Sequence, residues 1–543
     1  MLVHELERAR EPPGRRDLGE GPAHRPLEGP AAVGLRGVVQ HADEDRGTGH
    51  RRSLADRRRA VRRPAPGPTP GLGSWPTQRK GRGAMATVEH PVHTATSPSV
   101  PTDRTSPSAL TGLAAFGNDL IPRERFTSVD FLALEYERLW PRVWQVACRV
   151  EEIPEPGDFV EYAIGDRSAF VVRTGAGEVR AFHNTCIHRG TALASGCGRF
   201  RGEIRCPFHG WRWDLDGNST FVLDAHEFPA EPAADLRLRD VRCETYGGFV
   251  FVNFDPDAPS LIRYLEEIPG YFDPYRPERM CFTTHKTTVL PANWKVVVDA
   301  FNEGYHIATT HPEILRWKDE AALEYTPLRT HTRYGGAGWP MPSPRLGIPT
   351  DEVDEQELLA HKIDDLIDNL PGYIGPAEAD ALRAVARTPL PEGTTAGDFY
   401  LKRRRDGAVA RGLDWSHLDD DQVLGGDDLL VFPNFIGPVI AGAFFGYRVR
   451  PNGMDPHSCI FELWTLEERA EGQPHTMCER EVYPDWRSHD WGLVVQQDFE
   501  NFEGIQRGLR NSAGGGLRWN RRQESCVRRF HEVLDRFLFD APT

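Results

Sequence analysis

Residues 293–312 read Asn-Trp-Lys-Val-Val-Val-Asp-Ala-Phe-Asn-Glu-Gly-Tyr-His-Ile-Ala-Thr-Thr-His-Pro, and this stretch decides how the chain is interpreted. Its residue pattern predicts a helix over 294–310. In a helix, residues three and four positions apart share a face, so Asp299, Glu303 and His306 would lie side by side. The stretch therefore presents two acidic groups and an imidazole together.

A second histidine follows, and its spacing indicates a metal site. His311 lies five residues after His306, so a regular helix would splay the two rings by about 140°. Both rings can reach one metal only if the helix widens or ends between them. Pro312 favours an ending, because the residue before proline avoids helical geometry. Two histidines and one distant carboxylate would form a facial triad, which leaves positions on Fe(II) open.

The expected third ligand is Asp498, on a helix predicted over residues 489–509. The 4, 3, 4 spacing predicts one shared apolar face for Asp498, Phe502, Ile505 and Leu509, whereas Glu500 and Glu503 fall elsewhere. A carboxylate on a buried face needs a partner, which can be a metal, an arginine or its own helix end. Together with the two histidines, the metal is the preferred interpretation.

A second motif lies upstream, in a region of short strands and glycine-rich turns. Cys186-Ile-His188 and Cys206-Pro-Phe-His209 each place a thiolate and an imidazole on one tight loop. Zinc accepts such a ligand set, but its cysteine and histidine pairs are usually spaced differently. A [2Fe–2S] cluster with two cysteines on one iron and two histidines on the other fits the pattern better.

With their flanking residues, Cys186-Ile-His-Arg-Gly and Cys206-Pro-Phe-His-Gly-Trp resemble the Rieske motif of ring-hydroxylating oxygenases. With the iron motif, the resemblance covers about residues 112–540. It implies an α+β fold, with a small all-β Rieske domain and a helix-grip (START-like) catalytic domain built on an antiparallel sheet. It further implies that Glu303 links His209 of a neighbouring subunit to His306.

Glu303 and Asp299 are the two residues to which the resemblance gives a catalytic role. Many aromatic-ring dioxygenases have Asp where this chain has Glu303, so other branches of the family stay open. Asp299 is expected to support the iron ligands; the alternative is a solvated helix residue.

The resemblance also implies an activity, cofactors and partners. We expect an oxygenase α subunit with a Rieske [2Fe–2S] cluster and a mononuclear Fe(II), supplied with electrons from NAD(P)H through a reductase, with or without a ferredoxin. A homotrimer, or an assembly with a β subunit (α3 or α3β3), is expected. Large apolar residues at Phe301, 429–435 and 439–445 favour dihydroxylation of an aromatic or other hydrophobic compound.

Three other functions compete with this interpretation. A pure electron-transfer protein needs only the cysteine–histidine motif, and a non-catalytic binding domain would have lost iron ligands; the complete ligand set argues against both. A monooxygenase acting on a quaternary amine stays open. It would need an aromatic cage around the cation, which the sequence does not identify.

The expected domains are an N-terminal extension and linker over 1–111, a helical segment of the catalytic domain over 112–143, the Rieske domain over 144–260 and the iron domain over 261–543. Alternating patterns predict strands at 159–162, 169–173, 248–253, 282–297, 429–449 and 459–466. Helices are predicted at 128–140, with Ser128 as N-cap, and at 261–272, 489–509 and 521–538. An acidic, loop-rich region is expected over about 345–425, and 351–368 is read as a lid or a solvated surface.

Composition excludes several protein classes. The 543 residues carry a net charge of −15, which argues against a nucleic-acid partner and fits docking of a basic protein. Neither a membrane span nor a signal peptide is predicted, and nine cysteines without disulfide spacing indicate a reducing cytoplasm.

The first 84 residues differ from the rest of the chain. They hold 17 Lys and Arg against 10 Asp and Glu, with much Pro and Gly and no periodicity, which predicts disorder. Two other interpretations are a true translation start at Met85, and a basic nucleic-acid-binding arm. Mass spectrometry of the native N-terminus would decide about the start.

Overall fold

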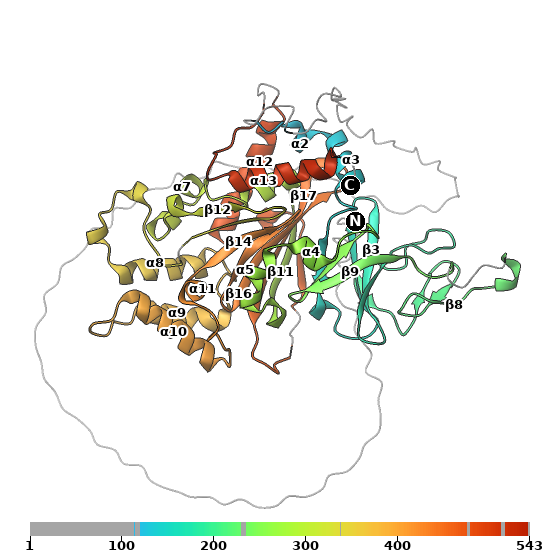
Figure 1. The fold of residues 1–543 in the computed structure, drawn as a ribbon, viewed down its shortest axis with the longest axis horizontal. Helices are drawn as coiled ribbons and strands as arrows, with labels where there is room; N and C mark the ends of the chain where they lie inside the picture. Colours follow the sequence, from blue (N-terminus) through green and yellow to red (C-terminus); the bar gives the residue numbers. More distant parts are fainter. Residues whose placement is uncertain are drawn as a thin grey trace, which may run out of the picture. The chain divides into compact units, whose positions relative to one another are not determined.

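The computed structural model describes residues 113, 120–229, 235–336, 338–474, 478–511 and 516–540. The predicted extension over 1–111, with its alternatives of disorder, a start at Met85 or a basic arm, lies outside these residues. The described part has an α+β architecture, as predicted, with two large sheets and a small one (Figure 1). None of its helices combines the length and apolarity that crossing a membrane requires.

The cysteine–histidine loops belong to the smaller, all-β half of the fold. A seven-stranded sheet runs in the order β1-β10-β9-β4-β3-β2-β5, and β6-β7-β8 form a separate three-stranded sheet. The strands are β1 (Gln145–Arg149), β2 (Asp158–Ile164), β3 (Arg167–Arg173), β4 (Val179–His183), β5 (Cys197–Arg199), β6 (Ile204–Arg205), β7 (Arg212–Trp213), β8 (Ser219–Phe221), β9 (Asp240–Tyr246) and β10 (Phe249–Asn253). One loop follows β4 and the other joins β6 to β7.

The second half is built on an eight-stranded sheet in the order β12-β13-β14-β15-β16-β17-β11-β18. Its strands are β11 (Met280–Leu290), β12 (Glu324–Pro327), β13 (Thr332–Gly335), β14 (Gly426–Val431), β15 (Phe435–Ile440), β16 (Ala443–Asn452), β17 (Asp455–Glu468) and β18 (Arg480–Tyr483). Neighbours pair antiparallel, except that β18 runs parallel to β11. Helices α6 (Trp294–Ala300), α12 (Leu493–Leu509) and α13 (Ser525–Leu538) pack against this sheet (Figure 1).

The first helices of the described part pack onto this second half. Helix α3 (Val129–Arg138) starts as predicted, with the Ser128 side chain accepting from the Phe131 N–H. Helix α2 (Glu124–Thr127) carries Arg125, which forms an ion pair with Asp535 of α13. The segment before the β-rich half is therefore tied to the last helix of the chain.

A buried ion pair joins α3 to α6, and its removal should destabilise the fold. Glu135 accepts from Lys295 Nζ at 2.6 Å and from Trp294 Nε1 at 2.9 Å, and both charged side chains are fully buried. We expect Glu135→Ala to lower the free energy of unfolding by about 3–5 kcal/mol, because the ammonium would stay buried without a partner. Urea unfolding against exposed Glu137→Ala checks this; equal losses in the two variants would contradict it.

The structure corrects the expectation of a loop-rich region over 345–425. Four helices occupy it: α8 (Glu355–Asp368), α9 (Pro376–Ala386), α10 (Ala396–Ala410) and α11 (Asp420–Leu424). Asp354, Thr395 and Asp419 cap the N-termini of α8, α10 and α11 through their side chains. The acidic stretch 351–368 is thus mainly a helix with its own buried apolar face, not a lid loop.

The single helix predicted over 261–272 is two short ones, α4 (Leu261–Leu265) and α5 (Ile268–Phe272). Glu266 between them has a left-handed backbone, with φ of 52°. Its carboxylate accepts from the N–H and hydroxyl of Thr330, so a tertiary contact accompanies the break.

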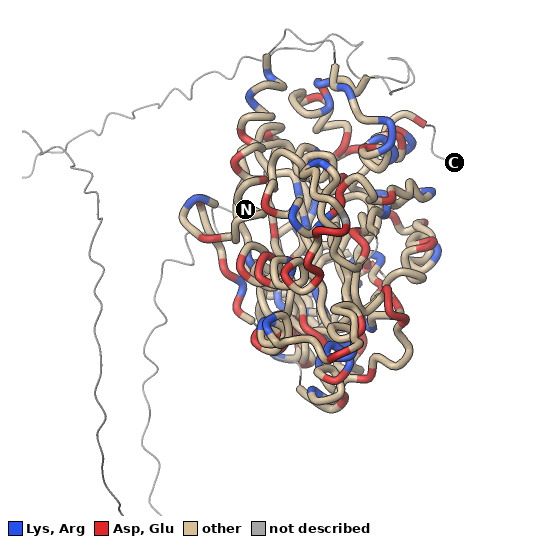
Figure 2. Tube along the Cα trace, turned by 90° about the vertical axis from the view of Figure 1, so that its left-hand side faces the viewer, with Lys and Arg blue, Asp and Glu red and all other residues tan. Residues whose placement is uncertain are grey.

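Charged residues of both signs are mixed over the described surface (Figure 2). No single-sign basic stripe runs along its elements in that view.

Candidate metal centres

The helix predicted over 294–310 is interrupted, which changes how its side chains are presented. Helix α6 ends at Ala300 and a short helix, α7, covers only Ile307–Thr310. Between them, the Glu303 carboxylate accepts from the backbone N–H groups of Tyr305 and His306. A side chain that binds nearby backbone groups competes with helix formation. The expected helical face of Asp299, Glu303 and His306 therefore does not form.

The interruption brings the two histidines together. His306 immediately precedes α7 and His311 immediately follows it, so the helix ends between the two histidines, as one of the predicted alternatives required. Their rings lie 5.1 Å apart between centroids and are tilted by 74°. One helical turn thus supports the two imidazoles as a pair.

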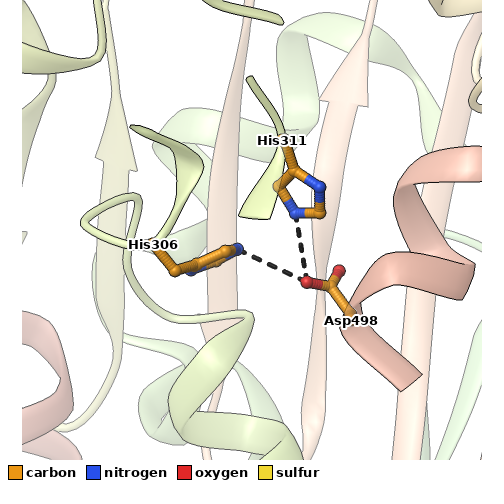
Figure 3. A group of neighbouring side chains, drawn as sticks. All are labelled: His306, His311 and Asp498. Atoms are coloured by element: carbon orange, nitrogen blue, oxygen red, sulfur yellow. Dashed lines mark ion pairs between the residues drawn. The ribbon is translucent and has the colours of Figure 1, made fainter. Parts of the chain in front are cut away.

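Asp498 of α12 completes a three-residue cluster (Figure 3). One ligand atom from each of His306, His311 and Asp498 lies within 4.8 Å of the others. Asp498 Oδ1 is 3.1 Å from His311 Nε2 and 3.5 Å from His306 Nε2. His311 and Asp498 are only 2% and 5% exposed. Two ring nitrogens and a carboxylate oxygen converge on one point, the donor set of a facial triad.

Both rings are oriented by acceptors on their far side. His306 Nδ1 lies 2.7 Å from Glu303 Oε1, and His311 Nδ1 lies 2.7 Å from Gln497 Oε1. An acceptor at Nδ1 keeps the proton there and leaves Nε2 with a free lone pair for a metal. The contacts therefore fit an iron ion. The sequence did not single out Gln497, because its contact with His311 depends on tertiary packing.

The charges around His306 change its protonation in the protein without metal. Burial lowers its pKa, but the hydrogen bond and charge of Glu303, followed by the charge of Asp498, raise the pKa to about 9. A metal would have to displace that proton.

Helix α12 is rotated relative to the predicted face. Asp498, Phe502 and Leu509 are buried as expected, but Ile505 is 44% exposed. Phe499 is fully buried instead. The prediction for Ile505 was wrong because the buried face is centred between Asp498 and Phe499, which turns residue 505 outward.

The side chain of Asp299 contacts a residue outside the three-residue cluster. Its Oδ2 is 3.1 Å from Nε2 of the fully buried His531 on α13. This contact joins α6 to α13. Any effect of Asp299 on the cluster would act through this packing.

Gln497 offers a test of how His311 is oriented. We expect Gln497→Leu to weaken Fe(II) binding by roughly 10–100-fold, because His311 loses the acceptor that fixes its tautomer. Anaerobic iron titration of metal-depleted protein measures this. Asn501→Leu is the control, since Asn501 is exposed and bonds only to the Gln497 carbonyl. Unchanged affinity in Gln497→Leu would contradict the assigned role.

The two cysteine–histidine loops have the same local construction. Each starts with a buried cysteine whose carbonyl accepts from a glycine N–H four residues later, Gly190 in one loop and Gly210 in the other. These glycines have φ of 76° and 72°, a conformation that favours glycine. Backbone N–H groups of each loop donate to its own sulfur, and the Cys186 and Cys206 thiols interact with each other.

The histidines of these loops meet at the same place. The His188 and His209 rings are 4.7 Å apart, and His188 stacks on Trp211 at 5.0 Å. His188 Nδ1 is a buried nitrogen without a partner among the described residues. Two adjacent thiols and two adjacent imidazoles, one with an orphaned nitrogen, fit a [2Fe–2S] cluster.

The segments expected to line a pocket are buried but only partly face the histidine–aspartate cluster. Phe301 stacks on Tyr447 at 4.1 Å and also contacts Phe502 of α12. Phe435 and Phe444, from the expected 429–435 and 439–445 segments, contact Phe249 of the other sheet. These side chains thus contact different neighbours within one hydrophobic core, which residue type alone could not distinguish.

A half-buried carboxylate that the sequence did not single out lies on the same sheet. Asp428 of β14 is the cross-strand partner of Tyr334, whose hydroxyl hydrogen-bonds to it. Burial raises the pKa of Asp428 to about 7. Tyr447 experiences the charges of both Asp498 and Asp428, so one ring lies near both carboxylates.

Comparison with known families agrees with both halves of the fold. Residues 143–229 match the Rieske [2Fe-2S] domain, and residues 277–539 match the ring hydroxylating alpha subunit catalytic domain.

Curated relatives cover the chain to different extents. The glycine betaine monooxygenase oxygenase subunit of Chromohalobacter salexigens is 30% identical over 410 residues, 73% of this chain and 81% of that protein. The carnitine monooxygenase oxygenase subunit of Escherichia coli K12 is 34% identical over 200 residues, 35% of this chain. That match spans about half of the relative's length, 52%.

Among solved structures, naphthalene 1,2-dioxygenase from Rhodococcus sp. aligns with a TM-score of 0.53. The alignment covers 78% of this chain and 95% of that one at 20% identity. This likeness concerns the fold.

Proposed function

Because the chain belongs to the family of Rieske oxygenase α subunits, we propose that it is the terminal component of an oxygenase that hydroxylates a small organic substrate. The convergence of His306, His311 and Asp498 within 4.8 Å carries the proposal. We divide its chain into a helical segment over 112–143, a cluster domain over 144–260 and an iron domain over 261–543.

Four residues would hold the cluster and three would hold the iron. Cys186, Cys206, His188 and His209 are the proposed cluster ligands, and His306, His311 and Asp498 the proposed iron ligands. When bound, the cluster supplies electrons and the iron supplies the site of O2 reduction. The chain's own residues orient the ligands: Glu303 holds His306, and Gln497 holds His311.

Transfer between the two centres is proposed to cross a subunit interface. The cysteine–histidine loops lie between β4 and β7 of the all-β half, and the iron ligands lie beside α7 and on α12 of the other half. The cluster edge is open, with Phe208 59% exposed, and the His306 side chain is 24% exposed. These surfaces suit a trimer in which His209 of one subunit approaches Glu303 of the next. A reductase, with or without a ferredoxin, is the proposed electron donor.

The first candidate reaction is monooxygenation of an amine. Asp428, with the rings of Tyr334 and Tyr447 near it, provides a carboxylate and aromatic faces, which together suit an ammonium group. The long match to a glycine betaine monooxygenase subunit supports this. Dihydroxylation of an aromatic compound is the second candidate, favoured by the apolar side chains Phe301 and Phe445.

A substrate panel under 18O2 tests both candidates. The holoenzyme, a reductase and NAD(P)H are incubated with quaternary amines or with aromatic hydrocarbons, and products are analysed by mass. One labelled oxygen in an amine product supports the first candidate, and two in an aromatic product support the second. Iron-loaded enzyme that oxygenates neither class would contradict the proposal.

A further inference from the structure

A cavity of about 100 Å³ lies between the helices of residues 355–410 and the ends of strands β14–β16. Its walls are strongly aromatic and strongly cationic. Trp317, Trp339, Tyr373 and Tyr400 contribute rings, and Lys318, Lys362 and Arg404 contribute positive charges. Among the lining residues, Glu378 is the acidic one.

The Glu378 carboxylate already forms ion pairs with two arginines. Arg404 Nε lies 2.9 Å from Glu378 Oε1, and Arg411 approaches the other oxygen at 3.4 Å. Both arginines thus share one carboxylate. No negative charge of the cavity wall is left for the lysines.

The two lysines lack carboxylate partners at ion-pair distance among the described residues. Lys362 Nζ donates to the carbonyls of Gly338 and Leu424, at 2.5 and 3.2 Å. The Lys318 ammonium forms no hydrogen bond or ion pair within the described part; Asp428 and Asp427 act on its charge from farther away. Neither ammonium has a carboxylate of the described residues at ion-pair distance to balance its charge, so an anion in this cavity would be stabilised.

Burial lowers the pKa of both ammonium groups, and the charges of Lys318 and Arg404 further lower that of Lys362, to about 7. The charged form of Lys362 is therefore destabilised by its two cationic neighbours. A bound anion would relieve that repulsion. The pKa values agree with a site that lacks its counter-ion.

The cavity is connected to the proposed iron site by two chain segments. Lys318 follows His311 by seven residues in the sequence. Trp317, which comes between them in the sequence, also lines the cavity. Ala443 lines the cavity, and Tyr447 on the same strand lies near Asp498. Four residues of strand span about 13 Å. The cavity wall is thus joined through β16 to Tyr447, whose electrostatic surroundings include Asp498.

We propose that this cavity is a carboxylate-binding subsite for the substrate, in which Lys318 Nζ binds the carboxylate and the aromatic walls contact the adjoining carbon atoms. The inference rests on the proposed oxygenase function, because it assigns the bound anion to the substrate of that oxygenase. It narrows the substrate class to compounds that carry a carboxylate. Asp428, whose charge already acts on Lys318, could also attract the cation of an amine that carries a carboxylate.

Calorimetric binding to the full-length holoenzyme, without reductant, tests the subsite independently of turnover. Two matched pairs serve as probes: trimethylglycine against its methyl ester, and phenylacetate against phenylacetamide. We expect at least one carboxylate to bind roughly tenfold or more tightly than its neutral-headed analogue. A difference in the trimethylglycine pair indicates that the substrate is an amine with a carboxylate. A difference in the phenylacetate pair indicates an aromatic carboxylate.

Variants of Lys318 assign the effect to one residue. Lys318→Met should remove the preference for the carboxylate, Lys318→Arg should restore part of it, and exposed Lys402→Met should leave it unchanged. Tryptophan emission should also change on binding in wild type, and less in Trp339→Phe. Equal binding of acid and neutral analogue in wild type, or an unchanged preference in Lys318→Met, would overturn the subsite.

A failed subsite and a failed function give different results. Product formation from neutral substrates alone, with no carboxylate preference, would contradict the proposed subsite but support the oxygenase function. Carboxylate binding that depends on Lys318, in a protein that takes up no mononuclear iron, would support the proposed subsite but contradict the oxygenase function.

Discussion

Asp498→Ala should lose the mononuclear iron and product formation while keeping the cluster. Asp498 supplies the one carboxylate oxygen that meets both histidine Nε2 atoms, and it comes from a helix distant in sequence. Without it, two imidazoles remain, which bind Fe(II) weakly. We expect iron content to fall from about three to about two atoms per chain, and turnover to fall by at least roughly 100-fold.

Glu500→Ala is the matched control for this variant. Glu500 lies two residues away on the same helix and is exposed. It should retain full iron and activity. Asp498→Ala protein that binds the third iron as tightly as wild type would show that the ligand assignment is wrong.

Glu303→Gln should keep both metal centres but lose turnover. The amide can still accept from the backbone N–H groups of Tyr305 and His306, so the loop between α6 and α7 should persist. The variant lacks the charge that faces His306 Nδ1 and, in our proposal, the link to His209 of a neighbouring subunit. We expect turnover to fall by at least roughly 100-fold. Glu303→Ala should show the same loss.

Cluster reoxidation separates a transfer defect from a binding defect. Pre-reduced Glu303→Gln should hold about as much iron as wild type and oxidise its cluster more slowly when substrate and O2 are added. Exposed Glu324→Gln should behave like wild type. Normal coupled turnover in Glu303→Gln would refute the proposed link.

Local signals predicted most of the fold. The Ser128 cap, the β strands around the cysteine–histidine loops and the two C-terminal helices follow from residue type and spacing within a few positions. The helices over 355–424 were not predicted, because acidic residues and prolines surround and interrupt their short apolar faces. These faces gain stability only by packing on one another and on Trp317.

Sequence spacing found the candidate ligands, but not their local geometry. Four residues of the two cysteine–histidine pairs sit on short loops, so spacing alone brings them together. The break between α6 and α7 depends on Glu303 binding its own backbone, which competes with a helical pattern. Three residues could not be identified from the sequence, because contacts with distant parts of the chain determine their surroundings: Gln497, Asp428 and Lys318.

Electron paramagnetic resonance of reduced wild-type protein exposed to nitric oxide tests the central claim most directly. The account predicts two signals, one from a reduced [2Fe–2S] cluster with mixed cysteine and histidine ligation and one from an iron–nitrosyl centre, each near one per chain. The nitrosyl signal reports open positions on an iron held by His306, His311 and Asp498. Zinc in place of the cluster, or iron-loaded protein without a nitrosyl signal, would contradict it.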